Sequence, residues 1–463
     1  MQRIGMCLIA LMIVPAPAAP ARGDDGKGDA VSFMKDVAPI LVRNCIACHN
    51  ARKAESKYNM TTFALLAKGG QQGEGMTLEP GDPEASQLVE LIRPNGQPRM
   101  PYKQDPLPPE AVATIERWVK EGARYDGDDK NEDWVALLHK KTPVNIPETY
   151  PVPVPITALA FSPDGSAVAT AGYHEVNLWR AADGSLARRL RGLPERVYDV
   201  AYSPDGKWLA TAGGDPGLFG SVKLWVAEPD GGGKPVRDLL ESTDSVFAVA
   251  FSPDSTLLAA AGADRAVRVW EVASGKLVAT IEDHADWVLD VAFSPDGKRL
   301  ATASRDKTSK VFDLAKKESL VTFPGHGDAV YCVGFAADGK TIATGGGDNQ
   351  VRLWRPDEDA KQVRSLGGFG GPVFRLVFAM DGKMLVATGA DKVVRVFNPA
   401  DGSTIRNLDG QEDWTYALAV AADGKGVAAG GWDGKVRLWN LADGKPAATF
   451  LAAPGRQAPA PSK

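Results

Sequence analysis

The chain has 463 residues, a formal net charge of −5, and hydrophobic and charged fractions of 44% and 24%. This length favours two or three domains, and the composition is that of a soluble protein with enough apolar residues to build a core. The acidic balance lacks the lysine and arginine excess of nucleic-acid binders, so we expect no nucleic-acid partner.

Residues 1–21 have the features of a secretory signal peptide. Arg3 and the amino terminus give a positive start, the apolar run Ile4–Val14 is too short to span a bilayer, and Pro15 and small residues follow. This order is typical of a cleaved signal, with a retained anchor as the alternative. We therefore expect a periplasmic or otherwise exported protein that loses Cys7 on cleavage and keeps no transmembrane segment.

Residues 43–50 read RNCIACHN and contain a C-x-x-C-H motif. The thiols of Cys45 and Cys48 stand one helical turn apart, which suits bonds to the two vinyl groups of one porphyrin, and His49 follows as the proximal iron ligand. A thioredoxin-like pair would need a βαβ context, and a zinc site would need further cysteine or histidine nearby. Because three cysteines remain in the mature chain, any disulfide leaves one over. The sequence therefore predicts one covalently bound haem c.

The motif is preceded by a helical pattern. Ser32 is suited to be an N-cap, and Pro39 inside the pattern predicts a kink or a late helix start. The apolar residues at helical spacing are Phe33, Val37, Ile40 and Leu41.

Two further helices are predicted after the motif. The segment EPGDPEASQLVELI predicts one, with Asp82 as its cap and Pro83 at its first position. The next is expected to begin at Pro109 and to end at Gly122. Its apolar stripe is Val112, Ile115, Trp118 and Val119. Since so short a helical segment has a modest protein core, we expect the haem-free domain to be poorly ordered.

The sixth iron ligand has several candidates. Met100 lies in a proline-rich loop before the last helix, where the chain is stiff enough to present a thioether to iron. A Met/His pair favours electron transfer and raises the reduction potential. The alternative is that Met100 is an ordinary loop or core methionine. The other candidates are Met34, Met60, Met76 and His139.

Several motifs in order resemble the planctomycete-type cytochrome c domain. They are FMKDVAPILVRNCIACHN, the glycine pair at 69–70, EPGDPEASQLVELI, RMP and LPPEAVATIERWVKEGA, and they cover residues 32–125. The resemblance implies a small, all-α, class I-like cytochrome with His49 as the proximal ligand and Met100 as the distal ligand of the haem iron.

A repeat begins after a proline-rich segment that ends at residue 155. FSPDG at residue 161 recurs in related form at 202, 251, 293, 335, 378 and 420, with spacings of 41, 49, 42, 42, 43 and 42 residues. A period in the low forties with four short strands per unit is typical of a propeller. In the second unit, the additional residues of GGDPGLFGSVK and EPDGGGKP predict surface loops. The chain enters on an inner strand and ends on an outer one, so we expect the ring to close by blade packing.

The repeated positions resemble WD-repeats over residues 156–451, with seven blades. The aromatic residues of the third strands are Trp179, Trp225, Trp270, Phe312, Trp354, Phe397 and Trp439. The aspartates of the preceding turns are Asp215, Asp264, Asp306, Asp348, Asp391 and Asp433. Blade one departs from the pattern, with His174 and Glu175 in that turn.

The propeller histidines and cysteine are expected to be structural. His284 and His326 occupy the position where WD-repeats hold a histidine that hydrogen-bonds within the blade, and His174 is a substituted turn residue. Cys332 alternates with strand residues as a core thiol. We find no Ser-His-Asp order, no phosphate-cradling glycine loop and no metal-ligand cluster in the repeats, and we assign no catalytic residue.

The sequence therefore predicts a multidomain protein with a small all-α cytochrome c domain followed by an all-β seven-bladed propeller. The predicted segments are a signal peptide (1–21), the cytochrome c domain (32–125), a proline-rich linker (126–155), the propeller (156–451) and a disordered tail (452–463).

The leading functional interpretation is an exported electron-transfer protein with one haem. Its propeller would be a docking scaffold, and redox proteins would dock on the propeller or at the haem edge. One alternative is an oxidoreductase whose propeller holds a second cofactor or a substrate, which rests on architecture alone. Another is a haem-based sensor with an open coordination position. The sequence favours electron transfer and binding over enzyme activity.

Overall fold

The computed structural model describes residues 30–46, 48–50, 54–70, 78–141, 146–150, 152–217, 219–227, 234–242 and 244–455. The predicted signal peptide and most of the predicted tail lie outside these residues. Of the described residues, those up to Cys45 and those in Ala54–Trp134 form one compact unit. The second unit holds the described part of Ile46–Lys53 and the chain from Val135 onward.

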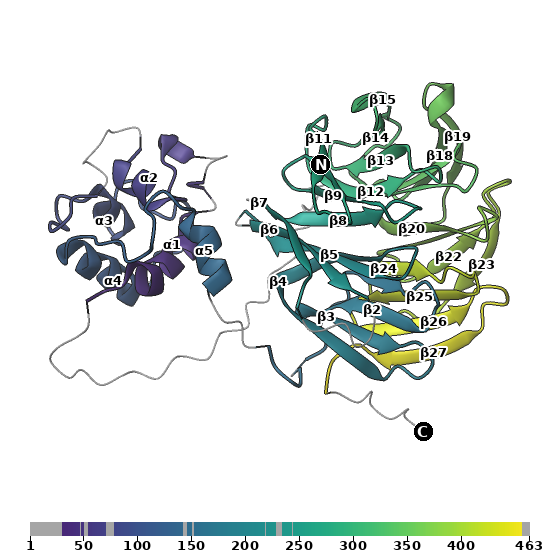
Figure 1. Ribbon diagram of the computed structural model, residues 1–463, viewed down its shortest axis with the longest axis horizontal. Helices are drawn as coiled ribbons and strands as arrows, with labels where there is room; N and C mark the ends of the chain where they lie inside the picture. The colour runs from purple at the N-terminus through teal and green to yellow at the C-terminus, as the bar shows by residue number, and fades with distance from the viewer. Residues whose placement is uncertain are drawn as a thin grey trace, which may run out of the picture. The chain divides into compact units, whose positions relative to one another are not determined.

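Helices dominate the first part of the chain (Figure 1). They are short, apart from one of twelve residues, so their stability must come from packing and not from helix propensity alone. The helical elements are η1 (Phe33–Val37), α1 (Ala38–Asn44), η2 (Glu55–Lys57), α2 (Phe63–Lys68), α3 (Gln87–Ile92), α4 (Pro109–Lys120) and α5 (Trp134–Lys141). Helix α5 falls in the segment that the sequence predicts as a linker.

The first helical segment begins and bends where the sequence predicts. The Ser32 hydroxyl accepts a hydrogen bond from the Lys35 backbone N–H at 2.9 Å, which caps η1. A turn of π-helix then passes into α1, in which Pro39 is the second residue. A proline is tolerated there because that N–H has no intrahelical partner.

The second predicted helix begins later than expected. Asp82 does cap a turn, since its carboxylate accepts the N–H groups of Glu84 and Ala85 at 3.0 and 3.1 Å. The Ser86 hydroxyl, however, donates back to the carbonyls of Glu79 and Asp82. These bonds hold residues 83–85 as a turn, and α3 begins only at Gln87 with Ser86 as its N-cap. The prediction of Pro83 as the first helical residue is therefore wrong.

An aromatic cluster forms the core of the helical unit. Four rings surround Phe33 with centroid distances of 5.1 to 5.5 Å, in edge-on or tilted orientations that aromatic pairs prefer. These rings are Phe63, Trp118, Tyr125 and Trp134. The predicted stripe of α4 is buried as expected, and Gly122 ends that helix in a left-handed conformation (φ +101°).

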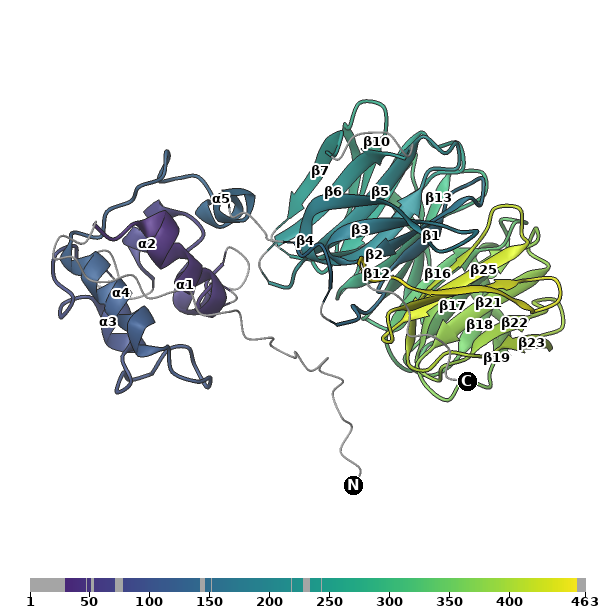
Figure 2. The same ribbon diagram turned by 90° about the horizontal axis from the view of Figure 1, so that it is seen from below.

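The second unit is built of antiparallel strands in four-stranded sheets (Figures 1 and 2). Blades three to seven each have their own sheet. Their strands are β8–β11 (Val246–Phe251, Leu257–Gly262, Val267–Glu271, Leu277–Ile281), β12–β15 (Val288–Phe293, Arg299–Ser304, Ser309–Asp313, Glu318–Phe323), β16–β19 (Val330–Phe335, Ile342–Gly346, Val351–Arg355, Lys361–Leu366), β20–β23 (Val373–Ala379, Met384–Gly389, Val394–Phe397, Thr404–Leu408) and β24–β27 (Thr415–Val420, Gly426–Gly431, Lys435–Asn440, Pro446–Leu451). A short helix, η3 (Pro356–Glu358), follows β18.

Blades one and two share one strand. The first part of β4 pairs with β3, and from Val197 onward the same strand pairs with β5. Two blades are therefore joined into one seven-stranded sheet. Its strands are β1 (Leu159–Phe161), β2 (Ala167–Ala171), β3 (Tyr173–Arg180), β4 (Leu186–Tyr202), β5 (Trp208–Asp215), β6 (Phe219–Val226) and β7 (Arg237–Ser242).

The first of the two predicted loops in blade two is instead a long hairpin. Strands β5 and β6 continue to pair through Gly214 opposite Gly220 and Asp215 opposite Phe219. Glycine is required here because a Cβ on Gly220 would lie 2.0 Å from the carbonyl oxygen of Asp244. Most of the second predicted loop, residues 228–233, lies outside the described residues.

Apolar clusters join each blade to the next, and the ring closes between blades seven and one. One cluster combines Ile156 and Trp179 of blade one with Val436 and Phe450 of blade seven, and Figure 1 shows β26 and β27 beside β2 and β3. All four strands of the last sheet come from the C-terminal part of the chain, so the ring closes by packing, as predicted. Two backbone hydrogen bonds reinforce this closure, from Ile156 N–H to Gly431 O at 2.9 Å and from Tyr150 N–H to Pro454 O at 3.2 Å.

Candidate functional site

The C-x-x-C-H motif follows directly on helix α1. The Cys45 N–H donates to the Leu41 carbonyl at 2.8 Å, so the helical hydrogen bonding runs into the motif. Ile46 is 1% exposed and anchors the next turn, and the Asn50 amide donates to the Ile46 carbonyl at 3.0 Å. Cys45, Cys48 and His49 are each partly exposed, so their reactive atoms are not sealed in the protein core. Residue 47 lies outside the described residues.

The buried side chain of Tyr58 lies near Cys45, the first cysteine of the motif. Burial, and then the charge of the nearby Cys45, raise the pKa of the Tyr58 phenol well above its ordinary value. Its hydroxyl donates to the carbonyl of Leu66 in α2 at 2.9 Å. Tyr58 therefore stays neutral and places an aromatic surface next to Cys45.

The Met100 loop is fixed to the end of helix α3. The Met100 N–H donates to the Leu91 carbonyl at 2.7 Å, and the Arg99 guanidinium donates to the Gln104 carbonyl at 2.8 Å. Gly96 lets the loop fold back, since a Cβ there would lie 2.7 Å from the Leu91 oxygen. Met100 itself is half-buried, so its thioether is held in place without being enclosed in the core.

The other candidate ligands differ in accessibility. Met60 is 1% exposed and belongs to the core, whereas Met34 is partly buried in η1. Met76 and the side chain of His139 lie outside the described residues. The donor types of Cys45, Cys48, His49 and Met100, two thiols, an imidazole and a half-buried thioether, fit a haem c. Met100 stays the predicted distal ligand.

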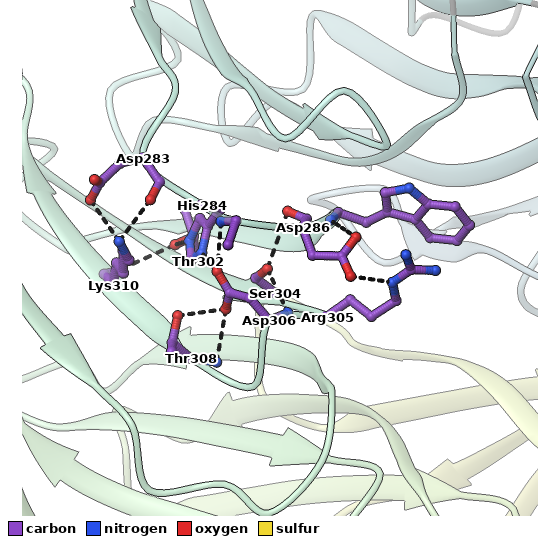
Figure 3. A network of polar contacts seen from close by, with 11 residues as sticks. Asp283, His284, Asp286, Thr302, Ser304, Arg305, Asp306, Thr308 and Lys310 are labelled. Atoms are coloured by element: carbon purple, nitrogen blue, oxygen red, sulfur yellow. Dashed lines mark hydrogen bonds and ion pairs between the residues drawn. The ribbon is translucent and has the colours of Figure 1, made fainter. Parts of the chain in front are cut away.

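Two propeller histidines are held inside their own blades. His284 is bonded through Nδ1 to Asp306 at 2.8 Å and through Nε2 to the Thr302 hydroxyl at 2.7 Å (Figure 3). His326 makes the same pair of bonds with Asp348 and Thr344. In His284, Nδ1 faces a carboxylate that only accepts, so Nδ1 carries the proton and Nε2 accepts from the hydroxyl. Nδ1 of His326 also lies 2.9 Å from Nη1 of Arg352, which pairs with Asp348 as well. Both imidazoles are thus used structurally, as the sequence predicts.

In three blades without such a histidine, an arginine pairs with the turn aspartate, and blade five has both groups on Asp348. The turn aspartates of blades three, six and seven form ion pairs with an arginine four residues later, with N–O distances of 2.6 to 2.7 Å. The pairs are Asp264–Arg268, Asp391–Arg395 and Asp433–Arg437. The repeated aspartates are therefore part of the blade framework, which agrees with giving them no catalytic role.

Blade one replaces this arrangement with a buried glutamate. Glu175 is 0% exposed and accepts hydrogen bonds from the Tyr150 hydroxyl at 2.6 Å and from Arg189 at 2.7 and 3.0 Å. Burial and the Glu175 carboxylate raise the pKa of Tyr150 above its ordinary range. His174 has a left-handed backbone (φ +57°) and contacts the Leu193 carbonyl at 3.1 Å. The sequence located this departure but not its partners Tyr150 and Arg189.

The two parts of the chain match two different protein families. The family described as WD domain, G-beta repeat matches residues 148–180, 184–218, 233–271, 275–313, 317–355, 360–398 and 402–440, which together exceed half of the chain. The chain belongs to the WD-repeat family. A second family, described as Planctomycete cytochrome C, matches residues 45–103 and so includes both motif cysteines, His49 and Met100. No curated relative matches the chain at a significant level.

These matches confirm the resemblance and the fold class predicted from the sequence. The WD-repeat chain carries a planctomycete cytochrome c domain, which makes it a haem-binding protein with a propeller scaffold. Among the residues that the structure describes, no helix is both long and apolar enough to cross a membrane. Within the same residues, no three acidic, histidine or cysteine side chains are grouped as metal ligands would be.

The central channel of the WD-repeat ring contains a charged group that sequence reasoning missed. A cavity of about 210 Å³ is lined by inner strands of all seven blades. In it, Arg375 on β20 contacts Asp199 on β4 at 3.1 Å and Asp290 on β12 at 3.4 Å. Burial raises the pKa of Asp290 to about 6, against the opposing effect of Arg375. Comparing the third residue of each inner strand would have revealed this group, because only three repeats carry a charge there.

Proposed function

We propose that this protein is an exported c-type cytochrome that carries one covalently bound haem for electron transfer, with the propeller as a docking scaffold for redox proteins. The observation that supports it most is the partly exposed C-x-x-C-H motif after α1, inside the segment that matches a cytochrome c family. The positively charged start and short apolar run of residues 1–21 support export to the periplasm.

The chain's own residues would have distinct tasks in this function. Cys45 and Cys48 would bind the porphyrin through thioethers, and His49 would supply the proximal nitrogen. When bound, the haem supplies a one-electron couple. Helix α1 fixes these three residues through its buried face, in which Leu41 is 0% exposed. Tyr58 beside Cys45 would exclude water from one side of the group.

Met100 would complete the coordination of the iron. Its loop is anchored through the Met100 N–H to α3, so the thioether position is set by backbone hydrogen bonding. A thioether opposite an imidazole stabilises the reduced state and raises the reduction potential. This pairing suits an electron carrier, because an iron with six ligands has no position open for a substrate.

The propeller supports the docking part of the proposal. Its described histidines make contacts within the propeller, and five of the repeated aspartates, Asp264, Asp306, Asp348, Asp391 and Asp433, are engaged within their blades. Repeat proteins of this kind present broad, rigid surfaces whose loops are free to vary. We therefore assign the propeller a binding role and the electron-transfer chemistry to the cytochrome c domain.

The test is to mature the full chain with haem-attachment machinery and to record optical spectra in both oxidation states. We expect a low-spin spectrum in the wild type and a high-spin spectrum in Met100→Ala. A Met34→Leu variant is the control, because it removes a different thioether and is expected to keep the low-spin spectrum. Binding of carbon monoxide by the reduced wild type would favour the sensor or enzyme alternative. An extractable second cofactor would favour the enzyme.

A further inference from the structure

The charged group in the propeller channel has an excess of negative charge. Arg375 is the one cation in contact with two carboxylates, those of Asp199 and Asp290, among the described residues that line the cavity. These side chains retain between 11% and 19% exposure, so they can be reached from the cavity. A buried charge without a counterion is costly, so this group favours a proton or an additional cation.

Both carboxylates are oriented by backbone groups and still have room for another donor. Asp199 accepts the Val249 N–H at 3.0 Å, and Asp290 accepts the Val333 N–H at 2.9 Å. Each of these bonds reaches the inner strand of the following blade. A carboxylate pair offers about eight lone-pair positions, more than the few donors present use. The acceptors are therefore held in place and not saturated.

Five inner strands carry an aromatic side chain at their second position, one residue before the position that holds the charged group. The rings of Tyr198 and Phe247 are 5.2 Å apart, and that of Phe374 lies 5.7 and 5.3 Å from those of Tyr331 and Tyr416. All five are half-buried. Such rings attract cations over their faces.

Acidic residues stand just before several of the inner strands. Five repeats carry a carboxylate two residues before the paired part of the inner strand, namely Glu195, Asp244, Asp286, Asp328 and Asp413. Asp286 is neutralised by Arg305 at 2.7 Å. Within the described part of the chain, Asp244, Asp328 and Asp413 take part in no ion pair of this kind. Carboxylates without a cationic partner favour the approach of cations.

We propose that the propeller channel binds the side chain of a lysine or arginine from a basic segment of a partner protein, with Asp199 and Asp290 as its acceptors. This proposal names the partner chemistry for the docking role proposed above, and it rests on that role and not on the haem. The carboxylates are in the third position of their strands, about 7 Å from the strand start at the usual rise. A long basic side chain can span that depth.

A metal ion fits this place less well than an organic cation. Calcium requires six to eight oxygen ligands, whereas the channel offers two carboxylates with a guanidinium between them. A planar guanidinium or an ammonium needs fewer acceptors and also gains from aromatic faces. Charge and shape therefore favour the basic side chain.

The experiment uses the haem-loaded full chain and a seven-residue glycine–serine peptide with one central arginine. Calorimetric titration is expected to show saturable binding of this peptide and of its lysine version. The peptide with neutral citrulline in the same place is expected to bind about tenfold more weakly. Asp199→Asn and Asp290→Asn are expected to cause a loss of similar size. Asp423→Asn, in an exposed turn, is the matched control and is expected to bind like the wild type.

A further variant tests the sign of the effect. Arg375→Gln removes the internal cation, so it is expected to bind the arginine peptide more tightly than the wild type, whereas mere structural damage would weaken binding. The proposal is overturned if citrulline binds as well as arginine, if the asparagine variants bind unchanged, or if millimolar peptide shows no saturation. It is also overturned if calcium alone binds and displaces the peptide. Haem spectra of the same samples keep the two proposals separate, because a missing haem contradicts only the cytochrome.

Discussion

The two units of this protein achieve order in different ways. The helical unit has short helices, six to twelve residues long in α2 and α4, and one aromatic cluster around Phe33. The propeller repeats a similar apolar cluster at each blade interface, including the closing one. In repeat architectures, stability is spread over many nearest-neighbour contacts. Removing one buried side chain should therefore destabilise the helical unit far more than the propeller.

The predicted haem chemistry and the structural polar residues also lie in different parts of the chain. The predicted haem-binding residues fall in the segment that matches the cytochrome c family. The helical unit has the smaller core, to which a bound porphyrin would add apolar surface. His284 and His326 of the propeller, by contrast, are held by the turn aspartates of their own blades. The most sensitive part of the molecule should thus be the part that binds the cofactor.

The largest effect is expected from losing the cofactor. Replacing both cysteines, Cys45→Ser with Cys48→Ser, should abolish covalent haem and leave the helical unit poorly ordered, while the propeller keeps its own unfolding transition. Mass spectrometry of the motif peptide and calorimetric melting of the full chain measure the two outcomes. Cys332→Ser is the control, since that thiol is buried in the propeller. Wild-type peptide without the added mass of haem would contradict the assignment.

A matched pair of tryptophans sharpens the comparison. Trp118 and Trp225 are both buried, and their indole N–H groups donate to Arg124 O at 2.9 Å and to the Thr211 hydroxyl at 3.1 Å. A buried tryptophan-to-alanine change costs about 3–5 kcal/mol. We expect Trp118→Ala to unfold the helical unit at room temperature and Trp225→Ala to lower the propeller transition without abolishing it. Circular dichroism and amide exchange measure the ordered structure that each variant loses. Equal losses in the two variants would show that the two units are equally sensitive.

The charged channel predicts a pH dependence confined to the propeller. Because burial raises the pKa of Asp290 from 3.8 to about 6, the protonated carboxyl is favoured by folding, and this stabilisation is lost as pH rises from about 4 through 6. Asp290→Asn should therefore be more stable than the wild type near neutral pH, by about 1–3 kcal/mol. The neighbouring titratable groups are Asp199, Arg375 and Cys332.

Urea unfolding at about pH 4.5 and pH 7.5 measures this difference. The difference in free energy of unfolding between variant and wild type should grow with pH. A difference that is constant or reversed would show that burying the ionised Asp290 carboxylate does not have the expected cost. Asp423→Asn, in an exposed turn, should show no such trend.

The smallest effect is expected within a single blade. Thr302→Val removes the hydroxyl that donates to Nε2 of His284, leaving a buried acceptor unsatisfied at a cost of about 1–2 kcal/mol. Thr388 is equally buried, yet its hydroxyl makes only a long contact of 3.4 Å with the Val393 carbonyl. Thr388→Val should therefore cost less than half as much in the same unfolding measurement. A reversed order would contradict the structural role of this histidine.

Local sequence signals predicted much of the architecture. Pro109 and Gly122 mark α4 because each acts on its own backbone position, and the repeats reveal their strands through fixed spacing. The start of α3 was missed because Asp82 and Ser86 are both good caps, and only the Ser86 bonds to earlier carbonyls decide between them. Helix α2 was missed as well, since six residues give too short a periodic pattern.

The candidate sites were predicted to different degrees for a related reason. Cys45, Cys48 and His49 are adjacent in sequence, so their chemistry is readable there. Asp199 and Arg375 are 176 residues apart, and Asp290 and Arg375 are 85 apart. Only the closing of the ring brings these charges together, and they stand out in the sequence only when the third residues of the inner strands are compared across the repeats.

The shared strand β4 has a mechanical consequence for the ring. Since one uninterrupted run of backbone, Leu186–Tyr202, belongs to two sheets, a load that pulls blade one outward is passed directly to blade two. The other neighbouring blades share no strand and are held together by apolar clusters and by separate hydrogen bonds, such as those between blades seven and one. The sector next to the seam is therefore the stiffest, and a pulled ring should yield elsewhere before these two blades separate.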